Sequence, residues 1–204
     1  MTDQTRLAPY EHVPARPFTD PSLIRRDLAA LDYMRATLRA LLADPAPAGD
    51  QQEHLRLGER TGRGHDITIA RRAALLAGCD LAVVGFFGHR RSGIDLTPLL
   101  EADAALTGEF DQHVGVFSYS RLELDDGNWG NMVLLRDEAA AKLWLVSERH
   151  AYAVRQLAPR FYHTVRLHNA SLPGGVLGSE PIRLVLTRYY DYEAPLPWIA
   201  VREA

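Results

Sequence analysis

The sequence has a single cysteine, Cys79, in 204 residues. One cysteine excludes an internal disulfide and any metal site built from several thiolates, and it suits a reducing compartment. The first ten residues, Met-Thr-Asp-Gln-Thr-Arg-Leu-Ala-Pro-Tyr, lack the apolar core of a secretory signal. No apolar run approaches the roughly 18–20 residues needed to cross a bilayer. We therefore expect a cytoplasmic protein with no membrane partner.

An excess of basic charge is also missing. Lysine and arginine total 23 against 26 aspartate and glutamate, a formal net charge of -3, and no basic stripe typical of nucleic-acid binding is present. We therefore expect no nucleic-acid partner. The glycines at 85, 88 and 93 do not form a dinucleotide-binding motif. What the chain does have, 47% hydrophobic and 24% charged residues, is typical of a globular protein with one sizeable core.

The first 79 residues are interpreted as an N-terminal arm followed by a helical extension. Residues 1–20 are punctuated by proline and are predicted to be extended. Asp20-Pro21 is typical of a helix start, and apolar residues then recur every three or four positions until prolines 45 and 47 end the helix. Residues 45–65 are predicted to be a surface loop, and a second helix is predicted over 66–77.

Residues 80–204 are predicted to form an α+β domain of ferredoxin-like type. Period-2 and period-3.6 patterns alternate here, and Asp125-Asp126-Gly127-Asn128 predicts a hairpin turn. The predicted strands cover 81–87, 114–124, 129–135, 162–169 and 182–190. The predicted helices cover 94–110 and, capped by Asp137, 138–157, before a proline-punctuated arm over 194–201. The order β-α-β-β-α-β, with an extra C-terminal strand, predicts an antiparallel sheet with both helices on one face.

The opposite face of such a sheet also needs apolar cover. The N-terminal helices can supply it within the chain, or a second copy can supply it across a two-fold axis. We predict a homodimer, with Trp198 and Ile199 of the terminal arm packing on the partner.

The order of elements over residues 80–192, with Trp144-Leu-Val-Ser147 in the helix after the hairpin, resembles the dimeric α/β-barrel superfamily. This superfamily includes antibiotic-biosynthesis-type monooxygenases and heme-degrading enzymes. The resemblance implies a pocket between sheet and helices, with His150, Asn131 and Trp144 as candidate catalytic residues and Ser147 and Tyr119 as candidate substrate contacts. It leaves two alternatives for the cofactor, none or heme. Against heme, the position of the usual ligand histidine is occupied by valine 154, and the first strand lacks the expected asparagine.

Helical spacing places His150 on one stripe of the helix with Leu143, Ser147, Val154 and Leu157. All of these neighbours except Ser147 are apolar. Burial there lowers the pKa of His150 and favours a neutral imidazole that can accept a proton or ligate iron. The alternative is a core histidine bonded to a backbone carbonyl. We expect His150 and Asn131 to approach one cavity.

A second candidate cluster lies in the strand over 162–169. His163 and His168 are five positions apart and so point to opposite faces, which argues against a shared metal; no metal site is predicted. Arg166 and Arg188 can meet across neighbouring strands and, with His168, bind a carboxylate or phosphate, or each arginine can pair with a surface carboxylate.

Two functions remain open. The first is a small oxygenase or related lyase acting on an apolar or aromatic molecule. The second is a non-catalytic module that binds a small ligand or assembles through its barrel. A cavity of roughly 300 Å³ or more around His150 favours the enzyme, and tight packing with every donor satisfied favours the module.

Overall fold

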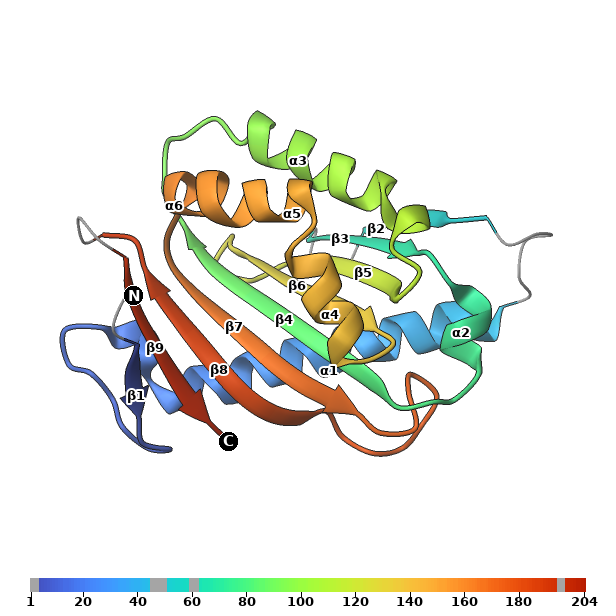
Figure 1. The fold of residues 1–204 in the computed structure, drawn as a ribbon, viewed down its shortest axis with the longest axis horizontal. Coiled ribbons are helices and arrows are strands. Elements are labelled where there is room, and N and C mark those ends of the chain that lie inside the picture. Colours follow the sequence, from blue (N-terminus) through green and yellow to red (C-terminus); the bar gives the residue numbers. More distant parts are fainter. Residues whose placement is uncertain (1–3, 45–50, 59–62, 194–196) are drawn as a thin grey trace.

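The computed structural model describes residues 4–44, 51–58, 63–193 and 197–204, and it is an α+β fold built on one nine-stranded sheet (Figure 1). The strand order is β1-β9-β8-β7-β4-β6-β5-β3-β2, antiparallel except for the parallel pair β1 and β9. The strands are β1 (Thr5–Leu7), β2 (Glu53–Gly58), β3 (Gly64–Ile69), β4 (Leu81–Arg90), β5 (Val116–Glu123), β6 (Trp129–Leu135), β7 (Tyr162–Leu172), β8 (Arg183–Asp191) and β9 (Trp198–Glu203).

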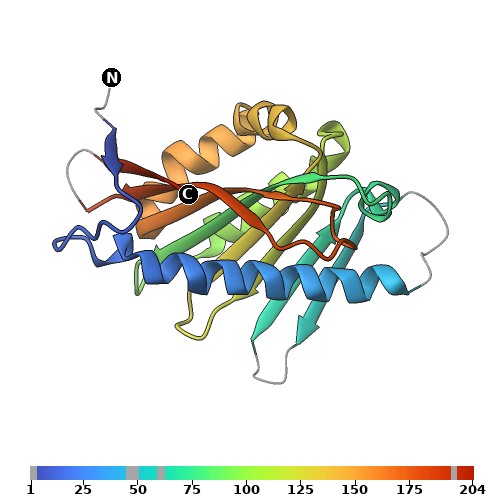
Figure 2. The same cartoon turned by 90° about the horizontal axis from the view of Figure 1, so that it is seen from below.

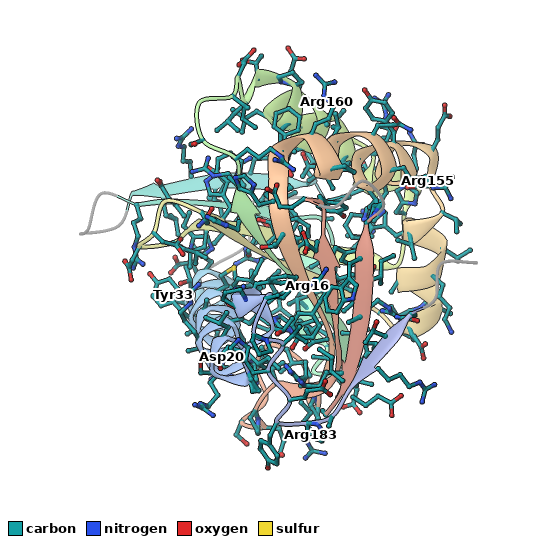
Figure 3. The ribbon with its side chains drawn as sticks, turned by 90° about the vertical axis from the view of Figure 1, so that its left-hand side faces the viewer. Arg16, Asp20, Tyr33, Arg155, Arg160 and Arg183 are labelled. Carbon is teal, nitrogen blue, oxygen red and sulfur yellow. The ribbon has the colours of Figure 1, made fainter. Side chains whose placement is uncertain are left out.

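Helices lie on both faces of this sheet (Figures 1 and 2). One face carries α3 (Thr97–Gly108), α4 (Glu138–Leu145), α5 (Glu148–Tyr152), a π-helical turn (Ala153–Leu157) and α6 (Ala158–Phe161). The long helix α1 (Pro21–Ala43) runs along the other face, and the short α2 (Arg72–Leu76) precedes β4. Short 3₁₀ turns occupy Pro17–Thr19 and Phe110–Gln112. In Figure 3, Tyr33 of α1 and Arg155 of the π-helical turn lie on opposite sides of the sheet.

The start of α1 is the one that the sequence predicts. The Asp20 carboxylate accepts a hydrogen bond from the Ser22 amide at 2.7 Å, and Pro21 occupies the first helical position, where its missing N–H costs nothing. The buried side of α1 carries Leu31, Met34 and Leu38, each with no exposed surface. A Cβ at position 85 would come within 2.9 Å of Leu31, so Gly85 lets the helix approach β4 closely.

Three predicted elements are wrong, and a fourth is interrupted. Within the described part of residues 45–65, β2 replaces the expected loop, and β3 with α2 replaces the helix expected over 66–77. The buried positions in β3 include His65, Ile67 and Ile69, a period of two that helical spacing does not produce. The helix expected over 138–157 is broken at Ser147 and continues as α5 and the π-helical turn. The terminal arm is strand β9, while residues 45–50, 59–62 and 194–196 lie outside the described part.

The core is divided by the sheet. One cluster lies between α1 and the sheet and includes Leu31, Phe87 and Met132, and another lies beneath the opposite helices and includes Phe110 and Trp144. Because α1 covers the second face from within the chain, the need for apolar cover no longer supports a homodimer.

Trp198 also packs inside the chain rather than standing free for a partner. Its ring lies 6.2 Å from that of Phe18, and the guanidinium of Arg16 stands 4.3 Å above it. The homodimer stays a prediction, but neither the uncovered sheet face nor a free Trp198 supports it. No helix in the described residues is both long and apolar enough to span a membrane.

Candidate ligand-binding site

Two adjoining cavities open between the N-terminal half of α1 and the sheet. The first has a volume of about 300 Å³ and the second about 250 Å³. Both are lined by Arg26 of α1, Phe87 of β4, and Leu124 and Asp126 of the β5–β6 hairpin. We call the two together the α1 hollow.

The floor of the α1 hollow is apolar and its rim is charged. Phe87 forms part of the floor, and Gly130 on the neighbouring strand makes room for its ring, because a Cβ there would lie 2.6 Å from a ring carbon. Ala30, Leu122 and Leu124 complete the apolar lining of the first cavity.

At the rim, an Arg26–Asp126 ion pair with N···O 3.5 Å links α1 to the hairpin turn, and Arg63 and Asp125 approach to 2.8 Å. An apolar floor inside a polar rim is the usual arrangement of a small-molecule pocket.

A buried charged network forms the wall of the α1 hollow nearest the sheet. The Asp27 carboxylate accepts two hydrogen bonds from Arg166, at 2.6 Å from Nε and 2.9 Å from Nη2, and its Oδ2 lies 2.9 Å from His168 Nε2. His168 Nδ1 lies 2.9 Å from the hydroxyl of Thr187. Asp27 lines the first cavity and Arg166 the second, whereas His168 and Thr187 have no exposed surface.

The network keeps Asp27 ionised. Burial by itself would raise the pKa of Asp27, but the hydrogen bonds from His168 and Arg166 and the positive charge of Arg166 outweigh it, and the pKa lies below its ordinary value. Arg166 therefore faces a permanent counter-charge on one side and the second cavity on the other.

His150 and Trp144 do come together, on the opposite face of the sheet. Their ring centroids are 4.3 Å apart, and burial lowers the pKa of His150 against an opposing hydrogen bond with the Leu145 backbone. Within the described residues, His150 Nδ1, Trp144 Nε1 and Ser147 Oγ are buried without a hydrogen-bond partner. Their predicted stripe is only partly buried, since Leu143 is 67% exposed.

Tyr119 packs in the same core cluster as Trp144, and its hydroxyl reaches α3. The Tyr119 hydroxyl donates to Asp103 at 2.6 Å, and Arg121, which is paired with Asn131 in the sheet, donates to the same carboxylate at 2.8 Å. Burial raises the pKa of Asp103, although the hydrogen bond from Tyr119 and the charge of Arg121 oppose this shift. Burial and the neighbouring Asp103 together raise the pKa of Tyr119 well above its ordinary value. In the described part of the chain, no hydrogen bond joins Asn131 to His150.

Arg166 and Arg188 do not meet, contrary to the expectation from sequence. Arg166 is paired with Tyr189 and Arg188 with Leu167, so the two arginines point to opposite faces of the sheet. Arg188 instead donates to Asn169 Oδ1 at 2.7 Å. His168 does share the face of Arg166, and His163 lies on the other, where its Nδ1 is 2.7 Å from Glu193.

Asp27 is the main residue of the candidate site that was not predicted from the sequence, although its position in the sequence indicates burial. It lies three positions after Ile24 and four before Leu31, in the middle of the buried stripe of α1. A charged residue on an apolar stripe requires a buried partner. Arg35 shows the same pattern, and it donates to the carbonyls of Gly175, Val176 and Glu180.

The imidazole of His150 packs on the Trp144 ring, and the two cavities of the α1 hollow lie on the other face of the sheet and include neither residue. A metal is not favoured elsewhere, since no group of three or more His, Cys, Asp or Glu side chains that could hold an ion comes together in the described ranges.

Comparison with known proteins gives little further guidance. No family model matches the chain, and no curated protein matches it. The solved structure of protein SO0527 from Shewanella oneidensis is similar over 47% of this chain and 92% of its own, with 15% sequence identity and a TM-score of 0.40. Similarity at this level does not indicate a function.

Proposed function

We propose that the protein binds a small amphipathic molecule in the α1 hollow. The observation that carries the proposal is the position of the buried Asp27–Arg166 pair at the wall of two adjoining cavities floored by Phe87. An ion pair taken out of water contributes little net stability, so its position beside a cavity favours a role in recognition. Cavities of this size accept a ring with a short chain.

Protein-observed NMR with 4-phenyl-1-butanol and 4-phenylbutyrate tests this proposal. We expect either probe to shift the amide signals of Phe87 and Leu122 at millimolar concentration. Ala30→Phe, which places a ring in the first cavity without removing a polar group, should abolish those shifts. Ala36→Phe is the matched control, because Ala36 is exposed on the same helix and lines neither cavity. Absence of shifts with both probes, or equal shifts in Ala30→Phe, would contradict the proposal.

A second candidate is the small oxygenase or lyase that the resemblance implies, centred on His150. The unpaired, buried Nδ1 of His150 beside Trp144 and Ser147 supports it, because a neutral imidazole with a free nitrogen can act as a base. His150→Gln should then abolish turnover of an aromatic substrate without changing the melting temperature greatly. A variant that melts lower yet retains full activity would point to a core histidine.

We also propose that β4 to β7 form a ferredoxin-like unit. The order β7-β4-β6-β5, fully antiparallel and with α3 and α4–α6 on one face, supports this assignment. In this view β8, β9 and β1 extend the sheet at one side, and β3 and β2 extend it at the other.

A further inference from the structure

We propose that the ligand of the α1 hollow is a monocarboxylate with an apolar body, and that Arg166, Asn128 and Thr164 bind its carboxylate in the second cavity. This inference rests on the proposed function and specifies the chemistry of the ligand. Three observations carry it: the donors that remain on Arg166, the donor set around it, and the distribution of charge between the two cavities.

Arg166 keeps donors that the protein does not use. Its hydrogen bonds to other described residues leave from Nε and Nη2, and both reach Asp27. The residue is only 7% exposed and lines the second cavity, so the N–H groups of Nη1 have little access to bulk water. A guanidinium with nearly buried, unused donors favours an oxygen acceptor, and a carboxylate or other oxyanion is its strongest partner.

The neighbours of Arg166 in the second cavity are also donors. The Oδ1 atom of Asn128 accepts the Arg90 amide at 2.8 Å, which leaves the Nδ2 group of Asn128 as a donor. Thr164 lies two residues before Arg166 on the same face of β7, and its hydroxyl can donate as well. A site that presents three donors selects a ligand head that only accepts hydrogen bonds.

Charge places this head in the second cavity. The second cavity is lined by two arginines, Arg26 and Arg166, and one aspartate, Asp126. The first is lined by two arginines and three aspartates. With histidine neutral, the second cavity carries one net positive charge and the first one net negative charge. An anionic head therefore belongs beside Arg166, and an uncharged body belongs beside Ala30 and Leu122.

A single negative charge matches the site better than a double one. The charged side chains that line the second cavity carry one net positive charge, and Asp27, which lies outside that lining, offsets part of it. A phosphate monoester carries between one and two negative charges near neutral pH and would leave part of its charge uncompensated in a partly dehydrated site. The structure thus favours a carboxylate over a phosphate.

The test compares three probes with the same aromatic end: 4-phenylbutyrate, 4-phenyl-1-butanol and phenyl phosphate, titrated by calorimetry or NMR. We expect phenylbutyrate to bind at least about tenfold more tightly than the alcohol, since hydrogen bonds to an ionised group are roughly twice as strong as neutral ones. Asn128→Asp keeps the acceptor for the Arg90 amide and replaces the donor by a charged oxygen. It should weaken phenylbutyrate about tenfold or more and leave the alcohol unchanged.

Thr164→Val provides a second variant that removes one donor and keeps the side-chain shape. It should weaken the affinity for phenylbutyrate by about three- to tenfold, as expected for one hydrogen bond. If Asn128→Asp fails to fold, this variant tests the inference in its place. Asn169→Asp is the matched control: it introduces the same charge on β7 but on the opposite sheet face, and it should change neither affinity.

The outcomes separate this inference from the proposed function. Equal affinity for the carboxylate and the alcohol, or tighter binding of phenyl phosphate, overturns the inference and leaves the proposed function intact. Binding of neither probe overturns the proposed function. Loss of phenylbutyrate affinity in Asn169→Asp as large as in Asn128→Asp would show a general charge effect and overturn the assignment to the second cavity.

Discussion

Replacing Asp27 by asparagine isolates the buried charge at the wall of the α1 hollow. The two side chains have nearly the same shape, so the substitution removes the negative charge without creating a cavity. Asp27 is 1% exposed and accepts hydrogen bonds from both Arg166 and His168. In the variant, the amide Nδ2 must face one of these donors, and Arg166 loses its counter-charge.

The expected cost follows from what remains buried. Removing one member of a buried ion pair typically destabilises a protein by about 3–5 kcal/mol, because the other charge is left unpaired. That is a large part of the roughly 5–15 kcal/mol by which domains are stable. With a urea m-value of about 2–3 kcal/mol/M, the unfolding midpoint should fall by about 1–2.5 M.

Urea unfolding followed by circular dichroism measures this cost, and Asp32→Asn is the matched control. Asp32 is exposed on the same helix, so its substitution should change stability by at most about 0.5 kcal/mol. The folded pKa of Asp27 lies below its unfolded value, so its contribution is present above about pH 4 and is lost as the pH falls through the folded pKa. A cost below about 1 kcal/mol at pH 7, or one that grows in acid, would refute the reasoning.

Two further predictions concern other parts of the molecule. Burial lowers the pKa of His150, so its contribution to stability is present above about pH 6.5 and is lost as the pH falls through the folded pKa; NMR titration should give a pKa below that of a free histidine, and a higher one would contradict the burial. Arg35→Met removes the donor to the carbonyls of Gly175, Val176 and Glu180 and should cost at least about 2 kcal/mol. Amide exchange should accelerate around those residues, and unchanged exchange there would show that the hydrogen bonds are dispensable.

Much of the fold follows from local signals in the sequence. The Asp20-Pro21 helix start, the apolar stripe of α1 and the hairpin turn at Gly127 each act over a few neighbouring residues, and the structure contains all three. Strand β9 could not be predicted in this way, because it owes its extended form to hydrogen bonds with β8 and β1 rather than to an alternating pattern of its own. Strand β2 does carry a local signal, since burial alternates along Glu53–Gly58 and the strand pairs with the next one, β3.

In the candidate sites, too, local sequence patterns predict that some residues share a face, whereas contacts between distant segments cannot be predicted. The contact of His150 with Trp144 does not follow from helical spacing, because residues six positions apart lie on different sides of a continuous helix; it depends on the break at Ser147. The contact between Asp27 and Arg166 joins α1 to β7 across 139 residues, and a single sequence contains no measure of such distances. Alternation does place Arg166 and His168 on one face, but it cannot say which helix covers them.

The parallel pairing of β1 with β9 has a consequence for the order in which the molecule can assemble. Thr5 pairs with Ala200, and Arg202 donates hydrogen bonds to the carbonyls of Ala8 and Thr19. During synthesis the residues around β1 emerge from the ribosome long before their partners in β9. Closing so long a loop is slow, so this edge of the sheet should form late.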